Sequence, residues 1–270
     1  MILSELKIYL KDLGKRPNKG LSQNFLINPN ITKKIVQLAD VQSGDHILEI
    51  GPGPGALTKA LLDTGANVYA IEKDEAFAES LSRLQNGRFK VYAADFLEFP
   101  LSSLPSNTKV VANLPYNITT PILEKAFSTP LFSSLTIMVQ KEIADRIRST
   151  GGKSFGSLSV FVQFYTEYLG SFPVPRSCFY PAPNVDSTVI RLDLKDTPKI
   201  DPIGFFELVH AAFQKRRKML SGTLPFPKNL TQEALVAIGS RPDVRPEALS
   251  FEKWVALFKK TRELLLQSKE

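Results

Sequence analysis

The segment Asn113-Leu114-Pro115-Tyr116 combines two hydrogen-bond acceptors with an aromatic ring. The Asn113 side-chain oxygen and the Leu114 main-chain carbonyl can both accept, and Pro115 stiffens the turn that presents them. The amino group of adenine is a poor nucleophile because its lone pair is conjugated into the ring. Acceptors aimed at its two hydrogens would free that lone pair, while Tyr116 stacks on an extruded base. The segment therefore suits methyl transfer to adenine, although an ordinary strand-ending turn uses the same residue types.

A glycine-rich turn is the second chemical signal. The segment Glu49-Ile50-Gly51-Pro52-Gly53-Pro54-Gly55 directly follows the apolar run 46–48, so we expect a strand to lead into it. A phosphate-binding loop would carry Lys and then Ser or Thr after its last glycine, and Gly55 is followed by neither. Two ligands remain: a dinucleotide pyrophosphate on a helix amino terminus, or S-adenosylmethionine lying across the loop.

Acidic residues at the ends of three expected strands favour the second ligand. Glu72 ends the apolar run 67–71, and Asp95 follows the run 89–94. Glu72 can bind ribose hydroxyls, and Asp95 can accept a hydrogen bond from the amino group of an adenine. Glu49 lies inside the glycine motif, where a carboxylate favours a cationic sulfonium over a diphosphate. Together these acids indicate a nucleoside-like ligand, as S-adenosylmethionine is.

Apolar runs alternate with helical patterns along most of the chain, which predicts an α/β fold with a mostly parallel, Rossmann-like sheet and helices on both faces. We expect strands at 46–48, 67–71, 89–94, 110–112 and 135–139, helices at 56–62, 74–84, 119–127 and 141–147, and an edge-like strand at 189–192. Asn113 then lies at the carboxyl end of a strand, where open α/β sheets bind ligands.

The strand pattern stops beyond Leu194, and the residues that follow are helical in period. We therefore predict three parts. They are a flexible basic segment over 1–20, a methyltransferase domain over 21–195, and a small helical domain over 196–270 that contributes to RNA binding.

A series of ordered motifs resembles the small-subunit ribosomal RNA adenine-N6 dimethyltransferase family. The motifs are Gln23 to Leu26, the Gly51 loop, Glu72, Asp95, Asn113 to Asn117, Gln140 to Glu142, Phe155 to Val160, Pro181 to Ser187 and Ala212 to Lys218. The resemblance implies S-adenosylmethionine as the methyl donor. It implies two adjacent adenosines as acceptors, in the hairpin loop near the 3′ end of small-subunit rRNA. A pre-small ribosomal subunit is the implied partner.

The resemblance also implies roles for single residues. The cofactor site would be lined by Asn24, Leu26, Gly51, Glu72, Asp95 and Asn113, and the catalytic turn would be Asn113, Leu114, Pro115 and Tyr116. Pro54 departs from the small or apolar residue that family members often carry, which bears on loop shape and not on chemistry. A sulfonium is already an activated donor, so in-line transfer requires alignment and desolvation, with no side-chain nucleophile and no metal.

Three alternatives share parts of this pattern. A large-subunit rRNA adenine-N6 methyltransferase has a similar cofactor loop and turn, but Asp186 and the motif Ala212 to Lys218 are of small-subunit type by resemblance. A DNA adenine methyltransferase would more often carry Asp in place of Asn113. A non-enzymatic ribosome-assembly factor that binds RNA would not require an intact catalytic turn.

The chain has 34 Lys and Arg against 27 Asp and Glu, a net charge of +7 that favours a polyanionic partner. The cluster Lys215, Arg216, Arg217 and Lys218 follows the amphipathic stretch 205–213 and is a candidate phosphate contact, or a solvated helix end. In the loop 151–155 we expect Lys153 near RNA phosphates and Phe155 against the target region. Lys15, Arg16 and Lys19 are further candidates for RNA contact. We expect Trp254 in the core of the small domain.

The single cysteine, Cys178, cannot form an internal disulfide, and His46 and His210 are too far apart in sequence to suggest a metal site. These residues predict a reducing cytoplasmic location and no metal. No apolar run approaches membrane-spanning length, and the amino terminus lacks the order of a signal peptide. We therefore expect a cytoplasmic monomer with no membrane partner.

Overall fold

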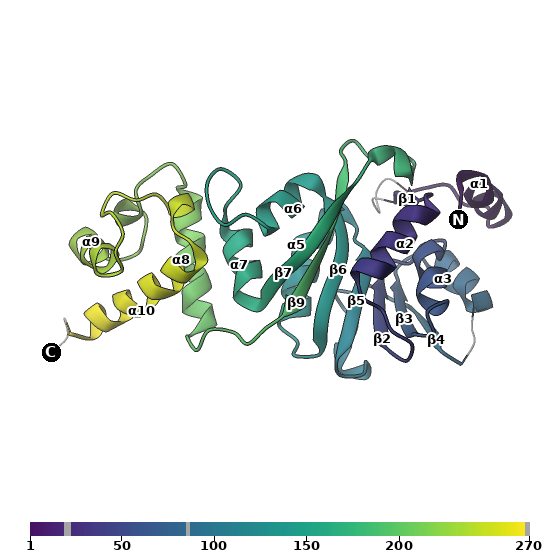
Figure 1. Ribbon diagram of the computed structural model, residues 1–270, viewed down its shortest axis with the longest axis horizontal. Helices are drawn as coiled ribbons and strands as arrows, with labels where there is room; N and C mark the ends of the chain where they lie inside the picture. The colour runs from purple at the N-terminus through teal and green to yellow at the C-terminus, as the bar shows by residue number, and fades with distance from the viewer. Residues whose placement is uncertain (19–22, 85–86, 268–270) are drawn as a thin grey trace. The chain divides into compact units, whose positions relative to one another are not determined.

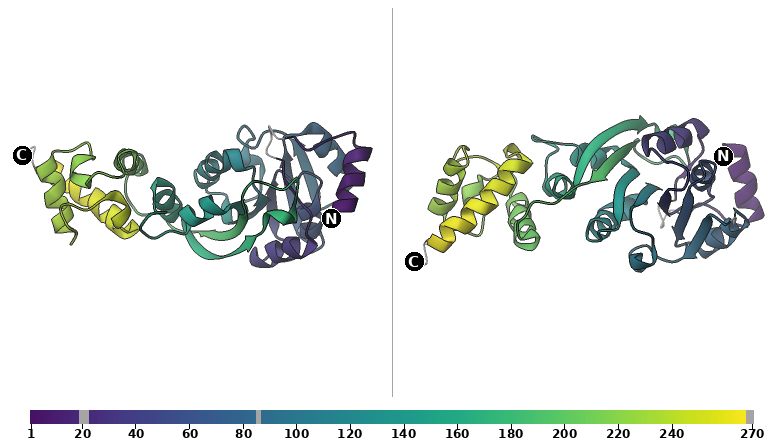
Figure 2. Two further views of the ribbon diagram at one scale, coloured as in Figure 1. Left: turned by 90° about the horizontal axis from the view of Figure 1, so that it is seen from above. Right: turned by 60° about the horizontal axis from the view of Figure 1, so that its bottom comes forward.

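The computed structural model describes residues 1–18, 23–84 and 87–267, and the chain divides into two compact units (Figure 1). The first, here called the sheet unit, combines Met1–Ala144 with Glu167–Leu194. The second, the helical unit, combines Asp145–Thr166 with Lys195–Glu270. Figure 2 shows the elements of both units from two further sides.

The sheet has seven strands in the order β4-β3-β2-β5-β6-β9-β7. Their bounds are β2 (His46–Ile50), β3 (Asn67–Glu72), β4 (Phe89–Ala93), β5 (Thr108–Asn113), β6 (Phe132–Gln140), β7 (Thr166–Val174) and β9 (Ser187–Leu194). The strands from β4 to β6 pair in parallel, and β9 pairs antiparallel with β6. The expected Rossmann-like α/β fold is confirmed. The strand order reverses between β2 and β5, and ligands bind at such a switch point.

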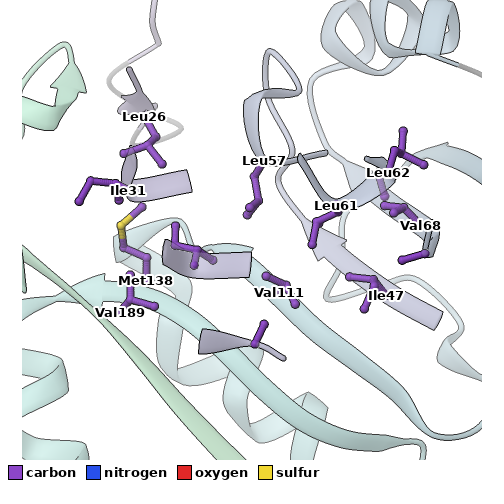
Figure 3. Close-up of a cluster of buried hydrophobic side chains, with 14 of the residues drawn as sticks. Leu26, Ile31, Ile47, Leu57, Leu61, Leu62, Val68, Val111, Met138 and Val189 are labelled. Carbon is purple, nitrogen blue, oxygen red and sulfur yellow. The ribbon is translucent and has the colours of Figure 1, made fainter. Parts of the chain in front are cut away.

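Helices accompany the parallel strands. They are α2 (Pro29–Leu38), α3 (Ala56–Leu62), α4 (Glu75–Leu81), α5 (Thr119–Phe127) and α6 (Lys141–Ile147). Of these, α3, α4 and α5 connect one parallel strand to the next. The Asn28 side chain caps α2 by accepting from two backbone amides, and the Asp74 side chain caps α4 by accepting from the Ala76 amide. Helices α2, α3 and α4 bury apolar residues against one face of the sheet, where Ile31 and Leu61 pack with Ile47, Val111 and Met138 (Figure 3).

The helical unit consists of α7 (Ser157–Tyr165), α8 (Pro202–Gln214), α9 (Lys228–Ala237) and α10 (Phe251–Gln267). Its core is aromatic, and Trp254 is fully buried there, as expected. The remaining elements are two short strands that pair with each other, β1 (Phe25–Leu26) and β8 (Phe179–Tyr180), and single 3-10 turns at Ser82–Leu84, Leu101–Ser103, Tyr116–Ile118, Arg176–Cys178, Leu220–Gly222 and Pro246–Ala248. In the described part of the chain, no helix has the length and apolar character required to cross a membrane.

The amino-terminal segment differs from the flexible tail that we expected. Residues Leu3–Asp12 form helix α1, whose Leu6 and Leu10 are buried against Phe25 and Phe77. This helix forms because its leucines repeat at helical spacing and meet an aromatic partner surface. Lys15, expected to be available to RNA, forms an ion pair with Asp74 at 3.1 Å. Arg16 is exposed, and Lys19 lies outside the described residues.

Two further expectations need correction. Residues Asp145–Thr166 belong to the helical unit, because Phe155, Val160 and Phe164 pack in the helical core and not on the sheet. The expected edge strand at 189–192 is part of β9, which lies inside the sheet, and the edge is β7. Gly170 and Pro173 interrupt the apolar pattern of β7, and an edge strand tolerates both residue types.

Candidate active site

A cavity of about 390 Å³ opens at the carboxyl ends of β2, β3, β4 and β5. It is lined by residues from all of these strand ends, together with the segment before α2. The residues predicted from the sequence that line it are Asn24, Leu26, Gly51, Glu72, Asp95, Asn113, Leu114, Pro115 and Tyr116. The structure thus places the predicted cofactor residues and the predicted catalytic turn around one space.

The glycine loop adopts backbone angles that favour glycine. Gly55 directly precedes α3 and has a φ of 84°, and a Cβ there would lie 2.7 Å from the Leu81 side chain. Gly51 has a φ of 67°, and the nearest atoms to a Cβ would be those of Pro115 at 4.0 Å, so that carbon would occupy cavity space. Pro54 is buried in the cavity wall, and the Gly55 amide donates to the Pro52 carbonyl at 3.0 Å beside it. The loop therefore accommodates Pro54 in an ordinary turn.

Glu72 is the last residue of β3, and its carboxylate is fixed by backbone amides. One oxygen accepts from the Gly53 amide at 2.9 Å, and the other accepts from the Asp74 amide at 2.8 Å. Only 7% of the residue is exposed, and this burial raises the pKa of Glu72 although the amide bonds oppose the shift. Each oxygen keeps a second lone pair, which a ribose hydroxyl can use.

Glu49 lies beside Glu72 and is 2% exposed. Its carboxyl group accepts a hydrogen bond from the Thr58 hydroxyl at 2.6 Å. Burial raises the pKa of Glu49 to about 8, and the negative charge of Glu72 adds to the effect. A cation in the cavity would offset both causes, so this pair of acids suits a positively charged ligand.

Asp95 follows β4 and forms an ion pair with Lys73 at 2.8 Å. The hydrogen bond from Lys73 lowers the pKa of Asp95, so this acid is ionised at neutral pH. The second oxygen accepts from the Leu97 amide at 2.8 Å. Sequence reasoning missed Lys73, although its position directly after Glu72 was a visible signal.

A second lysine missed from the sequence, Lys125 on α5, holds the loop that follows Asp95. Its ammonium donates to the carbonyls of Leu97 at 2.8 Å and Phe99 at 2.7 Å, and it lies 5.4 Å from the centre of the Phe96 ring. Phe96 and Leu97 line the cavity. Nothing in the local sequence pattern indicates these contacts, because they join segments that are 26 and 28 residues apart.

The turn Asn113 to Tyr116 begins at the end of β5, beside Met138 of β6. The Asn113 side-chain nitrogen donates to the Asn24 carbonyl at 3.2 Å, which leaves the side-chain oxygen as an acceptor. The Leu114 amide donates to the Met138 carbonyl at 3.1 Å and so extends the strand pairing by one residue. The half-buried Tyr116 shares a hydrogen bond of 2.7 Å with Ser187, and burial raises the pKa of its hydroxyl.

The candidate RNA contacts in the loop 151–155 and in the cluster 215–218 belong to the helical unit, and the structure gives their side chains different environments. Phe155 is fully buried in the core near Phe213, so the expected RNA contact is wrong for this side chain. Lys153 is exposed in its loop. The cluster Lys215 to Lys218 forms a turn after α8 and not a further helical segment, since α8 ends at Gln214.

Arg216 connects this turn with the loop. Its guanidinium donates to the carbonyls of Gly152, at 3.1 Å, and Lys153. Lys215, Arg217 and Lys218 are exposed. The turn and the loop therefore form one basic surface, which we define as Lys153, Lys215, Arg217 and Lys218.

Comparison with known proteins identifies the family. A model described as ribosomal RNA adenine dimethylase matches residues 14–262. The chain belongs to the ribosomal RNA adenine dimethylase family. It is accordingly an S-adenosylmethionine-dependent methyltransferase of rRNA adenine, and the glycine cradle and the acids at the strand ends fit that donor.

Individual proteins agree with this membership. A ribosomal RNA small subunit methyltransferase A from Protochlamydia amoebophila is 46% identical over 269 residues, covering 94% of this chain and 95% of that protein. The crystal structure of a dimethyladenosine transferase from Plasmodium falciparum has a TM-score of 0.76 at 25% identity, with 88% of this chain and 98% of that one covered. The 23S rRNA methyltransferase ErmE has a TM-score of 0.70 at 26% identity, with coverages of 88% and 100%.

Proposed function

We propose that this protein transfers methyl groups from S-adenosylmethionine to N6 of two adjacent adenosines in the 3′-terminal hairpin loop of small-subunit rRNA. The product would be N6,N6-dimethyladenosine, and the reaction would belong to small-subunit biogenesis. The observation that carries the proposal is the Asn113 amide, whose nitrogen is occupied by Asn24 and whose oxygen remains an acceptor at the edge of the cavity.

On the donor side, Glu72 would hold the ribose hydroxyls and Asp95 the adenine amino group, while Gly51 lets the ligand approach the backbone. Asn24 and Leu26 would close the opposite wall. The bound donor supplies an activated methyl group, so the protein contributes alignment and exclusion of water. Glu49 and Glu72 would provide negative charge next to the sulfonium.

On the acceptor side, the Asn113 side-chain oxygen and the Leu114 carbonyl would accept from the two hydrogens of the target amine. Pro115 would keep the turn rigid, and Tyr116 would stack on the base. Once the amine is methylated, it loses a proton to water, so no strong general base is required. These contacts matter most in the transition state, where the amine lone pair must point at the methyl group.

The similarity to ErmE makes a large-subunit rRNA a specific second candidate for the substrate. The 46% identity to a protein named small subunit methyltransferase A favours the small subunit. We further infer that the protein acts as a cytoplasmic monomer on a pre-small subunit, and that the basic surface of the helical unit contacts RNA phosphates.

Methylation of undermodified small and large ribosomal subunits in parallel, with mass mapping of the product nucleosides, tests the substrate. We expect dimethyladenosine in the small-subunit rRNA. Dimethyladenosine only in the large subunit would overturn the proposal.

The catalytic turn is tested in the same assay with Asn113→Ala. Turnover should fall by about 100-fold or more, with RNA affinity nearly intact, because the lost contacts act mainly on the reacting amine. Asn67→Ala is the matched control, since Asn67 lies at the amino end of β3 and donates to the Gly44 carbonyl. Turnover of Asn113→Ala equal to that of the control would rule out the assigned role.

A further inference from the structure

The motif from Pro181 to Ser187 ends at a buried hydroxyl that contacts the catalytic turn. Ser187 is the first residue of β9 and is fully buried. Its hydroxyl oxygen lies 2.7 Å from the hydroxyl oxygen of Tyr116. The two residues are 71 positions apart, so the contact depends on the sheet and not on the local chain.

The sheet register explains why they meet. Ser187 pairs with Gln140, the last residue of β6, while Asn113 pairs with Met138 of the same strand. The end of β5, the end of β6 and the beginning of β9 therefore lie together at the carboxyl end of the parallel strands. The turn that follows Asn113 runs across this end of the sheet, and it brings Tyr116 next to the first residue of β9.

Two hydrogen bonds hold Asp186, the residue directly before Ser187. The Asp186 carbonyl accepts from the Lys141 amide at 3.0 Å, and the Asp186 carboxylate accepts from the Arg176 amide at 2.8 Å. A buried hydroxyl on such a fixed segment is a rigid anchor. A tyrosine side chain has only two torsions before its ring, and its hydroxyl oxygen lies on the long axis of the ring, so anchoring this oxygen fixes the direction of that axis. Because the phenolic O–H bond prefers the plane of the ring, a partner in a fixed direction also restricts rotation about the axis.

We propose that Ser187 is a positioning residue that holds the Tyr116 ring in the orientation in which it stacks on the target adenine. The proposal rests on the proposed function, since it assigns the stacking role to Tyr116. It also gives a physical role to the end of the motif, from Val185 to Ser187, because Asp186 fixes the strand and Ser187 fixes the ring.

A double-mutant cycle tests this inference with Ser187→Ala, Tyr116→Phe and the combined variant. Each single change removes the same hydrogen bond, so turnover should fall by about 3- to 10-fold in both. The combined variant should be no slower than either single one, because the shared bond is already lost. The KM for S-adenosylmethionine should not change. Ser134→Ala is the control, since Ser134 is also buried but lies opposite Asp193, at the other end of the β6–β9 ladder.

Turnover losses that multiply in the combined variant would overturn the inference, and so would normal turnover in Ser187→Ala. If Ser187→Ala does not fold, Tyr116→Phe decides alone. Normal turnover in that variant, which keeps the ring and loses the bond, counts against the proposal, and a loss with unchanged KM supports it.

A second measurement does not depend on catalysis. Fluorine NMR of protein that contains fluorotyrosine would follow the titration of Tyr116, with the resonance assigned by Tyr116→Phe. The bond to Ser187 lowers the pKa of this hydroxyl against the effect of burial, so Ser187→Ala should raise it and Ser134→Ala should not. An unchanged pKa in Ser187→Ala would overturn the inference. The Tyr116 pKa could rise in Ser187→Ala although the wild-type protein methylates no adenosine. That result would overturn the proposed function and leave the inference intact, because Ser187 would still hold the Tyr116 ring.

Discussion

At the scale of single residues, the cavity carries two buried acids, Glu49 and Glu72, and burial raises the pKa of both. Each is nearly inaccessible to solvent, and the negative charge of Glu72 raises the pKa of Glu49 further. With a pKa of about 8, Glu49 is mostly protonated at neutral pH, and a cation in the cavity would favour its ionised form. A donor with a sulfonium charge should therefore bind with release of a proton, whereas the neutral thioether product should not.

The same pKa shift predicts how stability depends on pH. The folded-state pKa of Glu49 lies above its ordinary value of 4.5, so the folded protein binds more protons than the unfolded chain between the two values. Stability should therefore fall as pH rises, by roughly 1 to 3 kcal/mol between about pH 6 and about pH 9. Glu49→Gln should remove most of this loss, in thermal unfolding measured from about pH 6 to about pH 9. Glu124→Gln, at an exposed position on α5, is the control. Parallel pH curves for Glu49→Gln and the wild type would contradict the assignment.

At the scale of elements, α5 supports two walls of the cavity. It begins just after the catalytic turn, and its Lys125 holds the loop after β4 through two carbonyls. That loop carries Phe96 and Leu97 and follows Asp95, the residue expected to bind adenine. Helix α5 therefore links the geometry of the donor site to that of the turn.

Replacing Lys125 should affect donor binding more than chemistry. Lys125→Met keeps the length of the side chain and removes both hydrogen bonds, so the affinity for S-adenosylhomocysteine should fall by about 3- to 10-fold in calorimetry. RNA affinity should stay unchanged. Lys90→Met, at an exposed position of β4, provides the comparison. Equal affinities in the two variants would show that the loop keeps its shape without Lys125.

The elements found from the sequence are those with a strong local signal. The parallel strands were visible as apolar runs, and Glu72 and Asn113 were visible as polar residues at the ends of these runs. Helix α7 and strand β7 were missed because their residues owe their conformation to distant partners. The contacts of Lys125, and that of Ser187 with Tyr116, were missed for the same reason, since these hydrogen bonds join segments 26 to 71 residues apart. The position of the acids was predictable, and the supports that hold the site were not.

At the scale of the whole molecule, the net charge is +7, and the cluster Lys215 to Lys218 concentrates positive charge in the helical unit. The Arg216 guanidinium donates to carbonyls of the loop 151–155, while the next residue, Arg217, is exposed. The two arginines of the cluster should therefore differ in role.

We expect Arg217→Ala to weaken binding to the small subunit and to lower the log-log salt slope by about one unit, as the loss of one phosphate contact would. Cofactor affinity should stay the same, because the cavity is lined by residues of the sheet unit. Arg241→Ala is the control, since Arg241 is also exposed in the helical unit but pairs with Asp243. Binding across a salt series measures the effect. An unchanged slope for Arg217→Ala would assign the cluster to a solvated turn.

The path of the chain between the two units limits how the helical unit can be exchanged between this protein and related enzymes. The chain passes from one unit to the other after Ala144, after Thr166 and after Leu194, so the helical unit is assembled from two separate stretches. A chain shortened to residues 1–194 should retain Phe155, Val160 and Phe164 without the helices that cover them, and should aggregate or lose solubility. An exchange of the helical unit between related enzymes would have to carry residues 145–166 along with everything beyond Leu194. A simple fusion at the carboxyl-terminal boundary would join the new unit to the part of the old core that residues 145–166 contribute.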